Sequence, residues 1–186
     1  MQETMTEINC SLPANIGLPD LCLGQQIGIS FGSVFAGYVG TDWRHEYTVM
    51  GDEVNLAARL ESANKSFGTR VLVAEESLPA RHDDEFFARP LGRILVVGKN
   101  EPVSVWNLVS RREDALPDQV AAALTLAEGI SLFAEREFTE AALRFEKVLQ
   151  AMPADVPATM YLDLCRQYQA TPPGDAFTGA IQLTEK

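Results

Sequence analysis

The chain has 186 residues, of which 46% are apolar and 22% charged, enough for one ordinary folded domain and a small second module. Its formal net charge of −11 argues against nucleic-acid or anionic-membrane partners, which require a basic surface. Three widely spaced cysteines without disulfide or zinc spacing, and no apolar run long enough to span a bilayer, indicate a cytoplasmic protein without direct membrane contact.

The first part of the chain is predicted to contain a short helix, a loop and a β-hairpin. Apolar residues at helical spacing indicate a helix from Met1 to Leu12, which Pro13 ends. Residues 27–39 alternate like a strand, and 45–50 return after a polar turn, which predicts a hairpin. The intervening glycines lack G-K-[ST] and do not open a helix, so neither a P-loop nor a dinucleotide-binding fingerprint is present.

The stretch YTVMGDEVNLAARLE, residues 47–61, is predicted to form a strand, a turn and the start of a helix. Gly51 breaks the strand and Asp52 is the expected N-cap. Asn55 and Arg59 are four residues apart, so their side chains share one helix face. Arginine suits bidentate contact with phosphate oxygens, which indicates a polyphosphate site. From these two residues alone, an amphipathic surface helix with an incidental arginine is the simpler interpretation.

Beyond this helix we expect a short buried strand at 70–74, a polar helical turn at 77–84, and two strands at 88–97 and 102–109. The turn between these two strands contains Lys99, and a lysine in a turn is usually only solvated. His45 and His82 are the only histidines, and neither belongs to a metal-binding or general-base pattern.

Composition changes past Ser110. A charged linker covers residues 111–118, and helices are predicted at 120–135, 139–152 and 156–168. Small and aromatic residues in the first pair resemble a single degenerate tetratricopeptide repeat, namely Gly129, Ala141, Phe145 and Pro153. One such repeat cannot bury its own apolar face, so we expect these helices to lean on the preceding domain or to form a dimer contact. Residues 171–186 are expected to form a C-terminal tail.

Three segments together resemble the C-terminal part of a bacterial class III adenylyl/guanylyl cyclase catalytic domain: IGISFGSVFAGYVG, EYTVMGDEVNLAARLE and VVGKNEPVSVWNL. The resemblance covers residues 1–110 and implies an α+β fold, a ferredoxin-like cyclase domain that lacks its N-terminal half. An all-α, tetratricopeptide-like hairpin at 119–170 would follow it.

The resemblance implies conversion of ATP to 3′,5′-cyclic AMP and pyrophosphate. Asn55 matches the residue that orients the ribose, and Arg59 the residue that stabilises the transition state. Thr48 matches the position beside the purine ring and favours ATP over GTP. Lys99 matches a lysine that binds the triphosphate, although Val97 replaces a second lysine common at this turn.

The family also uses two Mg²⁺ or Mn²⁺ ions held by two aspartates, which would lie ahead of Met1. No metal ligands are therefore expected in this chain, which we predict to be inactive alone. A homodimer or a partner cyclase subunit would complete the site, and the helical tail could bind a protein partner. The alternative is a non-catalytic, cyclase-like dimerisation and protein-interaction module. In either case the missing strands would leave a sheet edge unpaired, which predicts poor solubility or oligomerisation.

Overall fold

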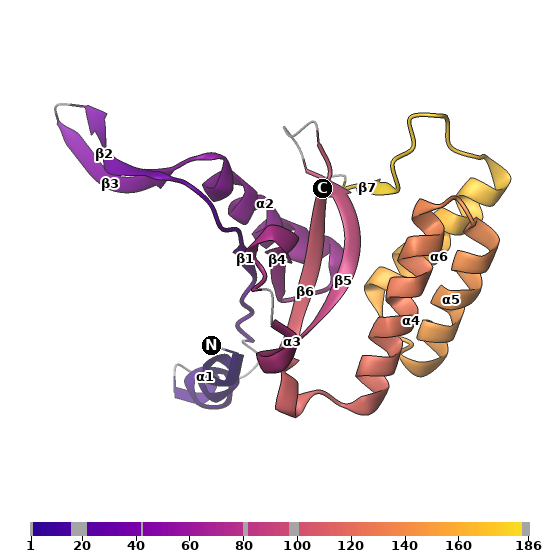
Figure 1. Cartoon of the computed structure of the whole chain (residues 1–186). Coiled ribbons are helices and arrows are strands. Elements are labelled where there is room, and N and C mark those ends of the chain that lie inside the picture. The colour runs from indigo at the N-terminus through magenta and orange to yellow at the C-terminus, as the bar shows by residue number, and fades with distance from the viewer. Residues whose placement is uncertain (1, 16–21, 42, 80–81, 97–100, 184–186) are drawn as a thin grey trace.

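The computed structural model describes residues 2–15, 22–41, 43–79, 82–96 and 101–183, which form an α+β fold with a mixed sheet and C-terminal helices (Figure 1). In chain order the elements are α1 (Gln2–Asn15), β1 (Ile27–Ile29), β2 (Phe35–Thr41), β3 (Arg44–Met50), α2 (Asp52–Phe67), β4 (Val71–Ala74), η1 (Glu75–Ser77), α3 (His82–Glu85), β5 (Phe86–Leu95), β6 (Val103–Arg111), η2 (Arg112–Asp114), α4 (Pro117–Ala134), α5 (Phe138–Ala151), α6 (Val156–Ala170) and β7 (Ala180–Gln182). None of the helices within these ranges is long and apolar enough to cross a membrane.

The main sheet has five strands in the order β1-β4-β6-β5-β7. Strand β6 is antiparallel to both of its neighbours, β4 and β5, whereas β1 runs parallel to β4 and β7 parallel to β5. Figure 1 shows α2 beside β1 and β4 and the three C-terminal helices beside β5, and buried residues of α2 and of these helices share one core with the sheet. All four residues of β4 are buried, as expected for a strand with a neighbouring strand on each side. Within the described residues β1 has a neighbouring strand on one side only.

The strand predicted at residues 27–39 is two strands in different sheets. Ile27–Ile29 joins the main sheet, and Phe35–Thr41 pairs with Arg44–Met50 in a separate antiparallel hairpin. The hairpin itself was predicted, but the break at residues 30–34 was not. The alternation of apolar residues at Ile27, Ile29 and Phe31 stops at Ser33, but the sequence pattern alone does not show that the chain leaves one sheet for another there.

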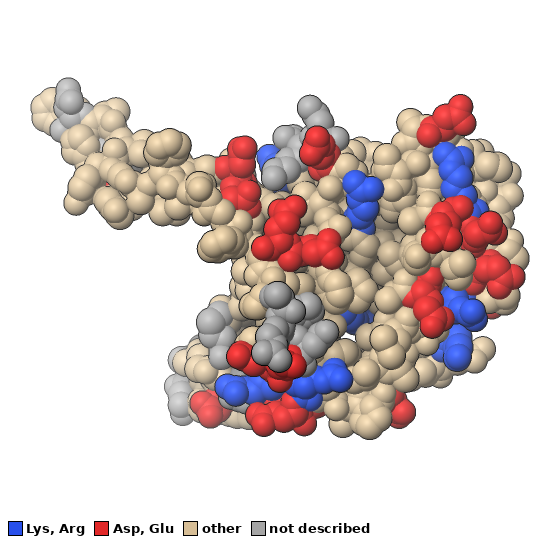
Figure 2. All heavy atoms as spheres, viewed as in Figure 1, with Lys and Arg blue, Asp and Glu red and all other residues tan. Residues whose placement is uncertain are grey.

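The β2–β3 hairpin, here called the hairpin arm (residues 35–50), projects away from the rest of the molecule (Figure 1). Its large apolar side chains are open to solvent, with Phe35 80%, Tyr38 76% and Trp43 96% exposed. Charged side chains are almost absent from the described surface of the arm on the face that Figure 2 shows. An isolated two-stranded hairpin is marginally stable in water, so an arm of this kind is suited to packing against another surface.

The three helices α4, α5 and α6, here called the helical unit (residues 117–170), pack on β5 of the sheet. Gly129 allows close helix contact, since a Cβ there would lie 2.6 Å from the ring of Phe145. The Tyr161 hydroxyl donates a hydrogen bond of 2.8 Å to the Leu91 carbonyl of β5. Burial raises the pKa of Tyr161 above its ordinary value. We expected these helices to pack on the preceding domain or to form a dimer contact. The contacts with β5 show that they pack on the preceding domain.

Residues 171–183 are built into the fold rather than forming a free tail. Arg136 donates hydrogen bonds to the carbonyls of Pro173 and Gly174, and its guanidinium lies over the ring of Phe177. Phe177 in turn packs edge-on against Phe133 of α4. The chain then adds β7 to the edge of β5, where Ile181 is buried. The predicted linker is also structured, because residue 111 ends β6 and residues 112–114 form η2.

Candidate functional site

The strand–turn–helix at the centre of the site begins where β3 ends at Met50. Gly51 has φ 155°, a conformation that side-chain-bearing residues rarely adopt, and it is the N-cap of α2 without a side-chain cap. The prediction that Asp52 caps the helix is therefore wrong, because the chain turns one residue earlier. Asp52 and Glu53 instead occupy the first helical turn, where negative charge is favourable. The Ser30 hydroxyl donates a hydrogen bond to the Glu53 carboxylate.

Helix α2 is seated closely on strand β1. A Cβ on Gly28 would lie 2.0 Å from the Ala57 carbonyl oxygen, so the two backbones meet with no room for a side chain. Leu56 and Leu60 are buried below the helix. Further along, the fully buried Asn64 donates a hydrogen bond of 2.9 Å to the Ile27 carbonyl of β1. Asn64, which ties α2 to β1, was not identified from the sequence. A polar residue among the apolar positions of a helix indicates such a buried hydrogen bond.

Asn55 and Arg59 lie one turn apart on α2, away from this seat. Asn55 is exposed and Arg59 is half-buried. Within the described part of the chain neither side chain makes a hydrogen bond or an ion pair with the protein. A helix held rigidly from below therefore presents an amide and a guanidinium whose donors are available to a ligand.

The other two predicted site residues are less closely placed. Thr48 is exposed on β3 opposite Gly37, in the hairpin arm, four positions ahead of α2. Among the described residues no hydrogen bond links Thr48 to Asn55 or Arg59. Lys99, together with Val97, lies outside the described residues. The structure thus brings Asn55 and Arg59 together and leaves the roles of Thr48 and Lys99 as predictions.

The described residues contain no group of three or more His, Cys, Asp or Glu side chains that could hold a metal ion. His45 is exposed on β3, and the side chain of His82 is outside the described part. The acidic residues of the first turn of α2 are close in sequence to Asn55, but Glu53 is engaged by Ser30. The donor groups at this site therefore suit an anionic ligand at Arg59 and do not form a cation site by themselves.

Comparison with known proteins identifies the family. The profile of the family described as "Adenylate and Guanylate cyclase catalytic domain" matches residues 16–110. The adenylate cyclase, terminal-differentiation specific, of Dictyostelium discoideum is 32% identical over 144 residues, which is 76% of this chain and 7% of that protein. Adenylate cyclase 1 of Rhizobium meliloti (strain 1021) is 36% identical over 109 residues, 59% of this chain and 16% of that protein. The crystal structure of the guanylyl cyclase Cya2 is similar with a TM-score of 0.48 and 29% identity, over 61% of this chain and 54% of that chain.

The chain spans less than a fifth of the length of either of these two curated relatives. The Dictyostelium alignment of 144 residues is longer than the part of this chain that ends with the family match at residue 110, so it extends into the helices that follow. Asn55 and Arg59 both lie inside the matched segment. With its α+β fold, mixed sheet and C-terminal helices, the chain belongs to the adenylate and guanylate cyclase catalytic domain family.

Proposed function

We propose that the chain supplies Asn55 and Arg59 to a cyclase site that converts ATP to 3′,5′-cyclic AMP and pyrophosphate. The observation that carries this proposal is the presentation of both side chains, one turn apart and without protein partners among the described residues, on a helix seated against β1. In this reaction the ribose 3′-oxygen attacks the α-phosphorus and pyrophosphate leaves. Negative charge builds on the phosphoryl oxygens in the transition state, and a guanidinium fork is suited to stabilise it. An amide can hold a ribose oxygen in line for the attack.

ATP is the proposed substrate. Both curated relatives described above carry the name adenylate cyclase. Thr48 would lie beside the purine, where its hydroxyl can donate or accept a hydrogen bond. Lys99 would contact the triphosphate, and with valine at position 97 the turn offers one lysine there rather than two.

Class III cyclases use divalent metal ions, Mg²⁺ or Mn²⁺. Among the described residues, no group of three or more acidic, histidine or cysteine side chains is placed to hold such an ion. We therefore assign the metal ligands to residues outside the described part and derive no catalytic step through the metal. The roles proposed for this chain are binding and orientation by Asn55 and charge stabilisation by Arg59.

The proposed partner is a second copy of the chain or another cyclase subunit. The hairpin arm favours a protein partner, because Phe35, Tyr38 and Trp43 are largely exposed and few charges accompany them (Figure 2). A site divided between two subunits would combine Asn55 and Arg59 of one with the metal ligands of the other.

A complementation assay tests this proposal. The purified chain is mixed with Rhizobium adenylate cyclase 1 in which the residue aligned with Arg59 is replaced by alanine, and cyclic AMP is measured with ATP and Mn²⁺. We expect little product from either protein alone and clear production from the mixture. Arg59→Ala in the chain should lower that production by roughly 10²–10³-fold. A stable complex, seen by size-exclusion chromatography, that makes no cyclic AMP would refute the catalytic roles.

A stable complex that makes no cyclic AMP would favour the second candidate function, a non-catalytic dimerisation and protein-interaction module. The exposed aromatic side chains of the hairpin arm are the observation in its favour. Under that function, substitution of Trp43 would weaken the complex, whereas substitution of Arg59 would leave it unchanged.

A further inference from the structure

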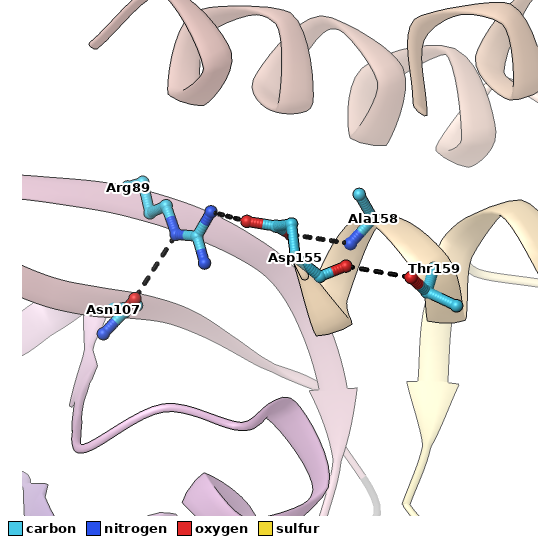
Figure 3. Close-up of polar contacts among 5 residues, drawn as sticks. All are labelled: Arg89, Asn107, Asp155, Ala158 and Thr159. Carbon is cyan, nitrogen blue, oxygen red and sulfur yellow. Dashed lines mark hydrogen bonds and ion pairs between the residues drawn. The ribbon is translucent and has the colours of Figure 1, made fainter. Parts of the chain in front are cut away.

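A chain of polar contacts joins the helical unit to the sheet (Figure 3). Asp155 caps α6: one carboxylate oxygen accepts from the Ala158 backbone N–H at 2.9 Å, and the other pairs with the guanidinium of Arg89 on β5. The Arg89 Nε donates to the side-chain oxygen of Asn107 on β6 at 3.3 Å. Asn107 in turn donates to the carbonyl of Val71, the first residue of β4, at 3.1 Å. The contacts therefore run from the first turn of α6 across two strands to the start of a third.

Capping alone does not explain the charge at Asp155. Its side chain is 1% exposed and that of Arg89 is 13% exposed, so both charges are largely removed from water. Asparagine or serine would cap the helix equally well without an ionised group to desolvate. The carboxylate is needed only for Arg89, and removing one charge of a buried pair is strongly destabilising because the other charge is left unpaired, so the two segments are held together at this point. The pair thus specifies where α6 begins relative to β5.

The start of α6 also touches the end of α2. Val156 follows Asp155, and a Cβ on Gly68, the C-cap of α2, would lie 2.8 Å from a Val156 methyl. Gly68 has φ 62°, and three residues later the carbonyl of Val71 accepts the hydrogen bond from Asn107 described above. The connection from α2 to β4 is therefore held at both ends by contacts that lead back to the N-terminus of α6.

We propose that the helical unit positions the cyclase helix α2, with Asp155 and Arg89 as positioning residues. By fixing the α2–β4 connection, the ion pair sets the position of α2 along the sheet, and with it the position of Arg59. This proposal rests on the proposed function for the role of Arg59. The similarity of the Dictyostelium adenylate cyclase, which continues past the family segment into the helices, is in keeping with it.

Hydrogen–deuterium exchange on the full chain tests the coupling without any need for activity. Asp155→Asn keeps the cap and removes the charge. We expect exchange to rise by about tenfold in the last two turns of α2 as well as at the start of α6. The matched control is Glu146→Gln, which breaks an exposed ion pair with Arg166 on the outer face of the helical unit and should change neither segment. Faster exchange confined to α6 would overturn the proposal.

A second variant keeps the test decisive if Asp155→Asn does not fold. Val156→Ala shortens a side chain that is 42% exposed and should leave the fold intact. Faster exchange at residues 64–69 supports the proposal, and exchange equal to that of the unmodified chain refutes it.

In the complementation assay, Asp155→Asn should lower kcat by about tenfold and leave the KM for ATP unchanged, because Thr48, the proposed purine contact, lies on the hairpin arm away from α6 (Figure 1). If the substitution only destabilised the protein, a smaller fraction of molecules would be folded and active. Dividing kcat by the folded fraction measured by circular dichroism removes this effect. If the unmodified chain gives no cyclic AMP, the proposed function fails while the exchange result still decides the positioning role.

Discussion

The substitution Gly28→Ala is the sharpest test of how α2 is seated. The added methyl carbon would lie 2.0 Å from the Ala57 carbonyl oxygen and 2.4 Å from the Glu61 nitrogen. Both atoms belong to the backbone of α2, so no side-chain rotation can relieve the contact. Real Cβ atoms stay at least 3.0 Å from such atoms, and α2 would have to move off β1 by about 1 Å.

Two consequences follow from a displacement of this size. Overpacking of this kind destabilises a core by roughly 1–3 kcal/mol. Arg59 lies two residues beyond Ala57 on the same helix, and a 1 Å misplacement of a catalytic group can lower the rate by about 10²-fold. We therefore expect both a lower free energy of unfolding and a large loss of complemented cyclase activity.

Urea unfolding followed by circular dichroism measures the first effect, and the complementation assay measures the second. Gly37→Ala and Gly24→Ala are matched controls, because a Cβ at either position meets nothing within 4 Å. These controls should be neutral or slightly stabilising, by up to about 1 kcal/mol, since alanine restricts the unfolded chain. If Gly28→Ala unfolds at the same urea concentration as Gly37→Ala, the close seating of α2 on β1 is refuted.

Four further predictions concern the helical unit, the cysteines and the hairpin arm. Tyr161→Phe leaves the buried Leu91 carbonyl without its donor and should lower the free energy of unfolding by about 1–3 kcal/mol, measured by thermal unfolding; an unchanged melting temperature would contradict the anchoring role. Burial raises the pKa of the Cys165 thiol from 9.0 to about 11, so iodoacetamide near pH 8 should label the exposed Cys10 and Cys22 and spare Cys165, as mass spectrometry would report. Because the folded state holds the Cys165 proton more tightly, its contribution to stability is present below pH 9 and is lost as the pH rises towards 11; urea unfolding at a series of alkaline pH values should follow this fall. Trp43→Ser should leave monomer stability unchanged, since the side chain is 96% exposed, but should weaken self-association in analytical ultracentrifugation; equal association would remove the arm from the interface.

Local patterns predicted the three C-terminal helices well, whereas α1 runs through Pro13 to Asn15 and does not end at Pro13 as predicted. The helical unit was expected at 120–135, 139–152 and 156–168, and the structure has helices at 117–134, 138–151 and 156–170. A period of 3.6 residues is a property of the segment itself, so no knowledge of distant partners is needed. For the same reason the spacing of Asn55 and Arg59 on one face of α2 could be derived from the sequence.

Features that depend on distant segments were not predictable in this way. Strand β7 forms because residues 180–182 pair with the edge of β5, where Ile181 lies opposite Ile94. Its three residues alone resemble a loop, so the sequence did not predict it. Arg89 and Asp155 each resemble an exposed charge, and only the fold brings them together in the core. The break between β1 and β2 was missed because the sheet that each strand joins depends on its pairing partner, which is β4 for β1 and β3 for β2.

The parallel pairing of β7 with β5 has a consequence for the order in which the chain folds. Arg93 of β5 meets Ala180, so the edge of β5 stays open during synthesis until the ribosome has added the entire helical unit and the segment after it. A contact so distant in sequence forms late and carries a high loop-closure entropy. A nascent chain halted within α6 would expose Ile94 and the aromatic cluster around Phe133, and would be prone to aggregate until the last strand is added.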